Sequence, residues 1–354
     1  MKKNRLSKTL VMGIVVLFVV MSIAPISGIQ IDKKIINPSS RGNILYVGGS
    51  GEGNYSSIQD AIDNTSEGDT VFVYDDSSPY YENLKVDKSI SLKGENKETT
   101  VINGNDSEIV VNISSDNVIL SGFTVLNYGN YSSHTSIIFI ESNYNVISGN
   151  IIIVYRSYGI EIIYSEYTTI SDNIITGNTS KSFSGIFIYE GKNNNISRNI
   201  IKNFLGGIAF GYSNNYSIYG NTLIDNRIGI NPAGFSINDV ISLNTISGSI
   251  FGIYALNCFN YKIIKNNFIG NLRNAGFGYY LFELFVFGFK YKSIRNIRST
   301  IKWDGNYWNK PRSLPKPIFG ELPPALIIPT PWFQFDWNPA QEPYDIPSIQ
   351  GCGI

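Results

Sequence analysis

Apolar and polar residues alternate in short runs that recur along most of this chain. In Ile160-Glu161-Ile162 and Ile186-Phe187-Ile188 every second residue is aliphatic, which is the period of a β-strand with one buried face. The runs are four or five residues long, rich in β-branched side chains, and separated by Asn, Gly and Ser instead of helical stretches. The pattern predicts an all-β chain of many short strands.

Two sets of residues show that these strands belong to a repeat of 22–23 residues. The first is Ile-x-x-Asn, whose asparagines are 23, 26, 22, 23 and 22 residues apart: Asn150, Asn173, Asn199, Asn221, Asn244 and Asn266. The second is a Gly followed by Ile, with spacings of 26, 22, 22 and 23: Gly159, Gly185, Gly207, Gly229 and Gly252. Because both sets keep the same period and share the 26-residue exception, they mark one repeating unit.

The repeat predicts a right-handed parallel β-helix. A single coil cannot bury its inner side chains, whereas coils stacked about 4.8 Å apart share a continuous core. Parallel crossovers are right-handed in nearly all cases. We therefore expect one single-stranded solenoid over residues 44–300, with its most regular coils at about 117–270.

The repeated Asn and Gly residues have structural explanations. An Asn in a turn tolerates left-handed backbone geometry, and equivalent Asn side chains one coil apart can bond amide to carbonyl in a ladder. We therefore assign the six asparagines a structural role and no catalytic one. The Gly set marks a turn that requires either a positive φ or close backbone approach.

Both ends of such a stack need covering, because they expose strand edges and an apolar cross-section. Ile58, Ala61 and Ile62 share one helical face, which predicts a capping helix at about 56–65. All four Trp and ten of the 14 Pro lie beyond residue 300. Proline cannot donate to a strand ladder, so we expect residues 301–354 to be an extended aromatic cap and not more sheet. The aromatic segment 277–289 is interpreted as an enlarged coil or an insertion at the cap edge, with a membrane or partner contact as the alternative.

The first 28 residues have the features of a signal peptide. A basic start is followed by the apolar run Leu10–Ala24 and then by small residues. The run is about 15 residues, shorter than the ~20 of a membrane span, although a retained N-terminal anchor is the alternative. Export follows in either case, residues 29–43 form a linker, and no membrane span is expected after cleavage. Cleavage removes four basic residues, so the number of Lys and Arg falls from 28 to 24, against 28 Asp and Glu. The cleaved chain therefore lacks the excess of basic residues that is typical of nucleic-acid binding.

Export also bears on the two cysteines and on glycosylation. A disulfide between Cys258 and Cys352 is permitted outside the cytosol, but Cys258 lies in a coil and would also fit as a small buried residue. Eight Asn-x-Ser/Thr sequons are present, at Asn54, Asn64, Asn105, Asn112, Asn130, Asn178, Asn195 and Asn215. In a chain this rich in Asn, Ser and Thr, many sequons arise by chance.

Several segments resemble the NosD-like β-helix proteins of archaea and bacteria. The N-terminal coil resembles theirs in Tyr55–Ile62, Gly68–Val71 and Lys88–Glu95, and the C-terminal part looks like the endings of archaeal secreted members in Asp304–Trp308, Phe335–Pro339 and Glu342–Ile346. The resemblance covers roughly 44–348 and implies the β-helix shared with pectin lyases and with carbohydrate-binding and sugar-hydrolase domains. The family label also implies periplasmic copper binding, in an accessory role in nitrous oxide reductase maturation. Copper favours clusters of His, Met or Cys, and this chain has only His134 as histidine, so we do not expect copper.

Two carboxylates are the candidates for an enzyme reading. When Ser136 is aligned with the Gly set, Glu141, Tyr164, Glu190 and Tyr212 occupy equivalent positions. Glu141 and Glu190 would then lie two rungs apart, about 9.6 Å, which is compatible with an inverting acid and base. No companion Asp pair, His or Arg shares the set, so solvated surface carboxylates are the alternative. A lyase would in addition hold calcium on acidic residues.

Outward tyrosines are the candidates for binding, since their rings can stack on sugars, although Tyr is also an ordinary strand residue. They are Tyr164, Tyr189, Tyr212 and Tyr254. The sequence therefore favours a secreted or cell-surface scaffold, adhesion or carbohydrate-binding module, with a polysaccharide or cell-surface glycan as partner. A polysaccharide lyase, hydrolase or epimerase is the alternative.

Overall fold

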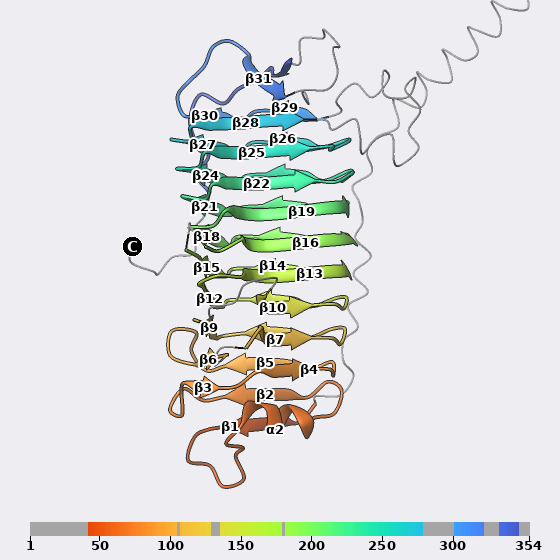
Figure 1. The fold of residues 1–354 in the computed structure, drawn as a ribbon, viewed down its shortest axis with the longest axis vertical. Coiled ribbons are helices and arrows are strands. Elements are labelled where there is room, and N and C mark those ends of the chain that lie inside the picture. The colour runs from red at the N-terminus through yellow and green to blue at the C-terminus, as the bar shows by residue number, and fades with distance from the viewer. Residues whose placement is uncertain are drawn as a thin grey trace, which may run out of the picture. The chain divides into compact units, whose positions relative to one another are not determined.

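Three long parallel sheets wind around one core (Figure 1). The computed structural model describes residues 42–104, 107–128, 135–178, 181–278, 301–321 and 333–346, which all belong to one unit, residues 40–354. Each coil contributes one strand to each sheet, and the strand pairs in parallel with its equivalent in the next coil. This arrangement confirms the predicted right-handed parallel β-helix.

The strands of each sheet follow one another along the solenoid axis. Sheet A holds β1 (Ile44–Val47), β2 (Thr70–Val73), β5 (Ser91–Gly94), β8 (Ile119–Ser121), β11 (Val146–Ser148), β14 (Thr169–Ser171), β17 (Asn195–Ser197), β20 (Ser217–Tyr219), β23 (Val240–Ser242), β26 (Lys262–Ile264) and β29 (Lys302–Asp304). Sheet B holds β3 (Tyr80–Tyr81), β6 (Val101–Asn103), β9 (Thr124–Asn127), β12 (Ile151–Val154), β15 (Ile174–Thr176), β18 (Ile200–Lys202), β21 (Thr222–Ile224), β24 (Thr245–Ser247), β27 (Asn267–Ile269) and β30 (Tyr307–Trp308). Sheet C holds β4 (Leu84–Val86), β7 (Ile109–Ile113), β10 (Ser136–Ile140), β13 (Tyr158–Glu166), β16 (Ser184–Lys192), β19 (Gly206–Asn214), β22 (Ile228–Ala233), β25 (Phe251–Leu256), β28 (Arg273–Gly278), β31 (Lys316–Glu321) and β32 (Phe333–Asp336).

The core is a set of aliphatic columns that run along the solenoid axis. In sheet A, Ile147 pairs with Ile170, which pairs with Ile196 in the following coil. All three side chains have no exposed surface. The coils from Ile147 to Ile263 each place an isoleucine directly above the previous one, and Val, Leu and Trp continue the column at its ends. The inner face of each coil is therefore buried by its neighbours, as a solenoid requires.

The repeated asparagines form a continuous buried ladder. The side-chain amide of Asn150 donates to Oδ1 of Asn173 at 3.1 Å, and each following amide donates to the next at 3.0 Å. The backbone N–H of each Asn donates to the same oxygen, for example Asn199 N to Asn221 Oδ1 at 2.9 Å. The expected left-handed geometry is one residue off, because positive φ occurs at the residue before the ladder Asn, as at Gly149 (66°) and Arg198 (54°).

The Gly set marks close backbone approach and not positive φ. A Cβ on Gly159 would lie 2.4 Å from the carbonyl oxygen of Gly185, and one on Gly185 would lie 2.4 Å from Cγ2 of Ile201. Gly159, Gly185, Gly207, Gly229 and Gly252 are all outside the positive-φ positions. Glycine is needed there because successive coils touch at this point with no room for a side chain.

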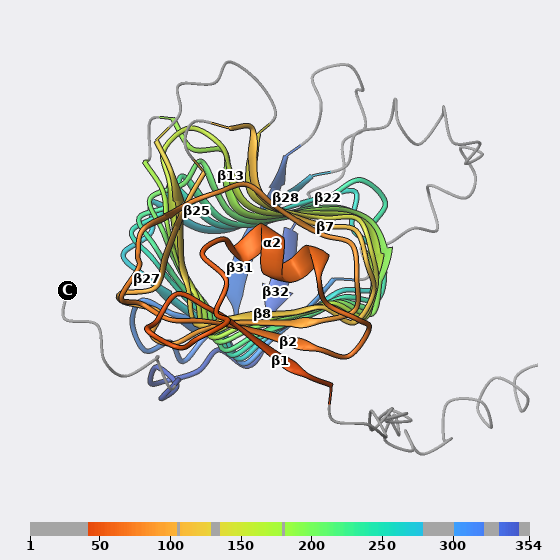
Figure 2. The ribbon, with the colours of Figure 1, turned by 90° about the horizontal axis from the view of Figure 1, so that it is seen from below.

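The N-terminal end is closed by the short helix α2 (Ile58–Asp63), within the range predicted for a capping helix. Viewed along the axis, α2 lies across the end of the coils (Figure 2). Ile58, Ala61 and Ile62 are fully buried. The carboxylate of Glu82 accepts from the backbone N–H of Ile58 at 2.8 Å and of Gln59 at 2.9 Å, so it satisfies amides that the first helical turn leaves unpaired.

At the other end, the expectation that residues after 300 form no further sheet is wrong. β29 and β30 add another parallel rung, and β31 and β32 pair antiparallel beyond it. Asn306 continues the ladder, and its amide donates to Asp336 Oδ2 at 3.1 Å, so a buried carboxylate terminates the row of amides. Pro317 is accommodated because β31 is near the end of sheet C, opposite Phe335 of the last strand.

Several sequence expectations fall outside the described residues. These are the signal peptide at 1–28, most of the linker at 29–43, His134, most of the aromatic segment 277–289, and Cys352. Cys258 is described and is a free, buried thiol. No helix among the described residues is long and apolar enough to cross a membrane.

Candidate functional site

A column of left-handed residues marks the corner where sheet C turns toward sheet A. Tyr164, Glu190 and Tyr212 each have a φ of 54° in successive coils, and Gly234 and Asn257 follow at 58° and 52°. This conformation is unusual for residues other than Gly, Asn and Asp. The local backbone turns the side chains at this corner outward, and Tyr164 and Tyr212 are 59% and 36% exposed.

Five aromatic rings follow this corner along the axis and form an aromatic stripe. The ring centroids of Tyr164 and Tyr189 are 6.3 Å apart, those of Tyr189 and Tyr212 5.4 Å, and the next two steps, to Phe235 and Phe259, are 6.3 Å each. The first two contacts are edge-to-face, with interplanar angles of 78° and 68°. The sequence identified the three tyrosines but missed both phenylalanines, because they lie six and seven residues after their coil's Gly instead of four or five.

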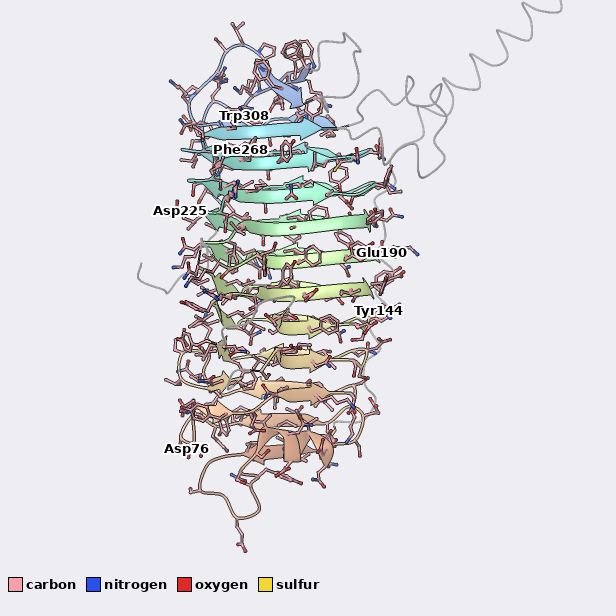
Figure 3. All side chains as sticks on the ribbon, in the orientation of Figure 1. Asp76, Tyr144, Glu190, Asp225, Phe268 and Trp308 are labelled. Atoms are coloured by element: carbon pink, nitrogen blue, oxygen red, sulfur yellow. The ribbon has the colours of Figure 1, made fainter. Side chains whose placement is uncertain are left out.

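A second aromatic pair lies beside the stripe in the lower coils. Tyr144 and Tyr167 stack with their centroids 5.1 Å apart and an interplanar angle of 4°. Both have positive φ, and both are about half exposed. Figure 3 shows that Tyr144 and Glu190 lie along the same edge of the solenoid. Sequence reasoning missed this pair because neither residue falls within a strand repeat.

Within the stripe there is a shallow depression of about 420 Å³. It is lined by Tyr189, Glu190, Gly191, Lys192, Tyr212 and Asn214. The depression therefore brings together two aromatic rings, a carboxylate, an ammonium group and an amide. Such a mixture of aromatic surface with a few polar groups is typical of small-molecule sites.

The charges of the depression are partly compensated. Lys192 Nζ lies 3.3 Å from Glu166 Oε1. The pKa of Tyr189 is raised, first by partial burial and then by the negative charge of Glu190. Tyr189 therefore keeps its phenol proton at neutral pH. Two carboxylates and one ammonium group leave this region with a charge of about −1.

Some of the predicted site residues line the depression, and others lie elsewhere. Tyr189, Tyr212 and Glu190 line it, and Tyr164 contacts Tyr189 from the coil below. Tyr254 lies elsewhere on sheet C, where it belongs to the column of Ala209 and packs 5.0 Å from Phe251.

The expected alignment of Glu141 with Glu190 is wrong by one residue. Ile138 and not Ile137 pairs with Ile160, and Ile140 pairs with Ile162. Glu141 is therefore level with Ile163, and the left-handed Tyr164 is the extra residue. Because adjacent strand residues point to opposite faces, this shift removes the basis for pairing Glu141 with Glu190.

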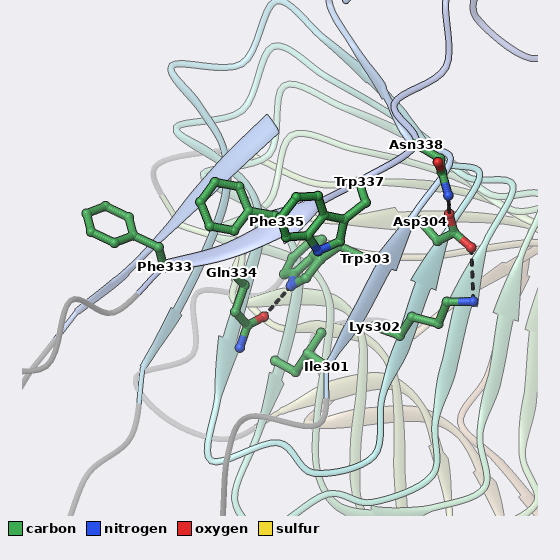
Figure 4. A pocket seen from close by; sticks show the side chains of 9 residues that line it. All are labelled: Ile301, Lys302, Trp303, Asp304, Phe333, Gln334, Phe335, Trp337 and Asn338. Carbon is green, nitrogen blue, oxygen red and sulfur yellow. Dashed lines mark hydrogen bonds and ion pairs between the residues drawn. The ribbon is translucent and has the colours of Figure 1, made fainter. Parts of the chain in front are cut away.

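A larger depression of about 450 Å³ lies at the C-terminal end (Figure 4). Its lining includes the exposed Phe333 and Trp337, together with Lys302, Asp304 and Asn338. Lys302 Nζ lies 3.0 Å from the carboxylate of Asp304, which also accepts from Asn338 Nδ2 at 3.0 Å. The first contact lies within β29, and the second ties the residues after β32 to β29, so we interpret the polar groups of this depression as structural.

Comparison with known proteins finds a curated relative and solved structures that are similar to this chain. A cell surface glycoprotein of Methanothermus fervidus is 27% identical over 318 residues, which cover 72% of this chain and 51% of that protein. The chain thus spans about half the length of this curated relative. Among solved structures, XylC in complex with xylose has a TM-score of 0.56 at 11% identity, with 67% and 68% of the two chains covered. Pectate lyase Pel9A has a TM-score of 0.51 at 13% identity, with 68% and 76% covered. At these identities the structural likeness concerns the fold alone.

The family model that matches is described as periplasmic copper-binding protein (NosD), and it covers residues 29–313. Copper is bound by imidazole, thiolate and thioether groups. Among the described residues only Cys258 offers such a donor, and its buried thiol contacts the carbonyl oxygens of Pro232 and Leu256. No group of three His, Cys, Asp or Glu side chains in the described ranges is arranged to hold a metal ion. The described residues therefore do not fit a copper centre, yet the match extends over most of the sequence, and the chain belongs to the NosD family.

Proposed function

We propose that this protein acts at the cell surface as a β-helix module that binds carbohydrate along the aromatic stripe. The observation that carries the proposal is the depression in which Tyr189 and Tyr212 meet Glu190, Lys192 and Asn214. Aromatic rings offer apolar surface for the C–H faces of a sugar, and their hydroxyl groups add hydrogen bonds. The neighbouring carboxylate, ammonium and amide groups are suitable partners for sugar hydroxyls.

The direction of the stripe supports a polymeric ligand. Ring contacts continue through Tyr164, Tyr189, Tyr212, Phe235 and Phe259, so equivalent surfaces recur in successive coils. A chain of sugars lying parallel to the axis would contact several of them at once. With a local charge of about −1, the site favours neutral or amino sugars over polyanionic ones, because a carboxylated or sulfated chain would be repelled by Glu190.

The surface location is supported by the relative from Methanothermus fervidus, which is named a cell surface glycoprotein. It is also supported by the signal-peptide features of residues 1–28 and by the periplasmic description of the family. Attachment to the envelope and secretion into the medium are both compatible with this proposal.

A polysaccharide-active enzyme is the second candidate, and Glu190 favours it because its carboxylate lies among the rings. An inverting glycosidase needs a second carboxylate about 6.5–9.5 Å away, and Glu141 is out of register for that role. A lyase would need acidic residues arranged for calcium. Binding without cleavage is therefore the better supported function.

The test is retention of the purified protein on neutral, amino-sugar and acidic polysaccharides, with release of reducing ends and unsaturated products measured in parallel. Tyr212→Ala should weaken retention roughly two- to twelvefold, since aromatic contacts contribute about 0.5–1.5 kcal/mol. Gly211→Leu is a second variant, because Gly211 pairs with Tyr189 and a Cβ there meets nothing closer than 3.5 Å. It should obstruct the depression without disturbing the coil.

Tyr254→Ala is the matched control, a tyrosine of sheet C outside the stripe. Retention that survives Tyr212→Ala and Gly211→Leu unchanged would refute the location of the site. New reducing ends or unsaturated products that disappear in Glu190→Gln would establish the enzyme instead.

A further inference from the structure

The asparagines of the described sequons differ in solvent exposure. Asn64 and Asn215 are exposed. Asn54 and Asn195 are half-buried, and their side-chain groups face the protein. We propose that Asn64 and Asn215 carry N-linked glycans in the exported protein and that Asn54 and Asn195 do not. This inference rests on the export that is part of the proposed function.

The geometry of Asn215 suits a modified side chain. It lies at a corner with a φ of 64°, and its Nδ2 donates to Asn193 Oδ1 at 2.6 Å. A glycosylated amide keeps one N–H, so this bond is compatible with a sugar on the second position. Asn215 belongs to an exposed outer row in which Asn260 likewise donates to Asn238, and a glycan there would extend away from the coils.

Asn64 is comparable at the other end of the solenoid. It is the C-cap of α2, and its Nδ2 donates to the carbonyl oxygen of Asp60 at 2.8 Å. The third residue of its sequon, Ser66, is exposed as well. A glycan at this position would stand outside the capping helix, whose buried face is formed by other residues.

Asn195 and Asn54 have no such room. Asn195 lies inside β17, between Thr169 and Ser217 of the adjacent coils, and its Oδ1 is buried without a hydrogen-bond partner among the described residues. Asn54 Nδ2 donates to the carbonyl oxygen of Gly48 at 2.6 Å, and both Nδ2 and Oδ1 of Asn54 would lie 2.9 Å from a Cβ built on Gly51. The amide of Asn54 is therefore enclosed by residues 48–51, whereas the hydrogen-bonded amides of Asn64 and Asn215 belong to exposed residues. A glycan on either amide would have to displace the neighbouring chain, so glycosylated forms at these positions would not reach the fold of this solenoid.

The modification is a group transfer. The Nδ2 atom attacks the anomeric carbon of an oligosaccharide that is linked to a polyprenyl phosphate or diphosphate carrier. A C–N bond forms, the bond from the anomeric carbon to the phosphate oxygen breaks, and the lipid phosphate leaves with the electron pair. The amide loses one proton. The protein supplies only the acceptor, and the donor is the lipid-linked oligosaccharide of the export pathway.

The experiment is glycopeptide mass spectrometry of the protein purified from the envelope and culture fluid of its own host. We expect glycan mass on the peptides that contain Asn64 and Asn215, and unmodified Asn54 and Asn195. Asn215→Gln and, as a second variant that keeps the asparagine, Ser217→Ala should each remove one glycan from the intact mass. Asn195→Gln is the matched control and should leave the glycan mass unchanged.

Exported protein with bare Asn64 and Asn215, or with glycan on Asn195, would overturn the inference while leaving carbohydrate binding intact. Protein that is recovered only inside the cell and unmodified would overturn both the inference and the surface location. The polysaccharide-retention assay fails or succeeds independently of these masses, so the two proposals are separable.

Discussion

Asp239 is a buried acid in a column where two other coils have the neutral amides Asn145 and Asn194. Its Oδ1 accepts from the backbone N–H of Tyr216 at 2.6 Å, and its Oδ2 accepts from Ser213 Oγ at 2.6 Å and from the Tyr261 hydroxyl. In coils nearer the N-terminus Asn145 and Asn194 accept the equivalent backbone bond at 2.9 and 2.8 Å. The carboxylate is therefore a charged replacement for an amide within the solenoid.

Burial raises the pKa of Asp239 from 3.8 to about 6, even though its hydrogen bonds act in the opposite direction. Because the folded state binds this proton more tightly than the unfolded chain, the contribution of Asp239 to stability is complete below pH 3.8. It is lost as the pH rises through about 6. A shift of about two pH units corresponds to about 3 kcal/mol. Burial also raises the pKa values of Cys258 and Tyr261, so neither group titrates in this range.

Asp239→Asn should remove this loss. The new amide can keep the bond from Tyr216 and donate to Ser213, as Asn145 donates to Ser142 Oγ at 2.9 Å. The Tyr261 hydroxyl, which loses Oδ2 as its acceptor, can turn its proton to the hydroxyl oxygen of Ser213. We expect the variant to match the original protein at pH 4 and to exceed its free energy of unfolding by about 3 kcal/mol at pH 7.5. The measurement is urea unfolding followed by circular dichroism at both pH values. Asp225→Asn, an exposed aspartate of the neighbouring coil, is the control. A variant that is less stable than the original protein at pH 7.5, or that keeps its pH dependence, would refute the reasoning.

Three other predictions concern the ladder and the corners. Asn221→Ala should lower the free energy of unfolding by about 2–4 kcal/mol in urea titrations, because the buried N–H groups of Asn199 lose their acceptor; a loss below about 1 kcal/mol would contradict the ladder's role. In the original protein the Asn306 backbone N–H donates to Asp336 Oδ2 at 2.9 Å. Asp336→Ala removes this acceptor and should therefore speed hydrogen exchange at the Asn306 N–H. Unchanged exchange would argue against Asp336 as the end of the ladder. Leu243→Gly should raise the thermal midpoint, since Leu243 has a φ of 54° and is 40% exposed and relief of left-handed strain contributes about 1 kcal/mol. Other coils already have glycine at this position, namely Gly149, Gly220 and Gly305, and a lower midpoint would contradict the strain argument.

The sequence by itself determined the architecture, because the repeat is a local property written once per coil. Ile147 and Asn150 recur with the period of the stack, so the inward column, the amide ladder and the parallel strands all follow from spacing. The capping helix could also be predicted, since Ile58, Ala61 and Ile62 share one face within a single turn. Asn306 was not assigned to the ladder from the sequence, because 40 residues separate it from Asn266 and the proline-rich composition argued against more sheet.

Only the tertiary structure decided which side chains meet. The left-handed Tyr164 has no counterpart in the coil of Glu141, and this extra residue separates Glu141 from Glu190. Tyr189 and Tyr212 meet diagonally, because Tyr189 pairs with Gly211, the residue before Tyr212. Composition could not reveal Asp336 as the end of the ladder, because that contact depends on an antiparallel strand folding back over the last coil. Spacing along the chain defines columns to within a residue, whereas a binding site depends on differences of a single residue, because neighbouring strand positions face opposite sides.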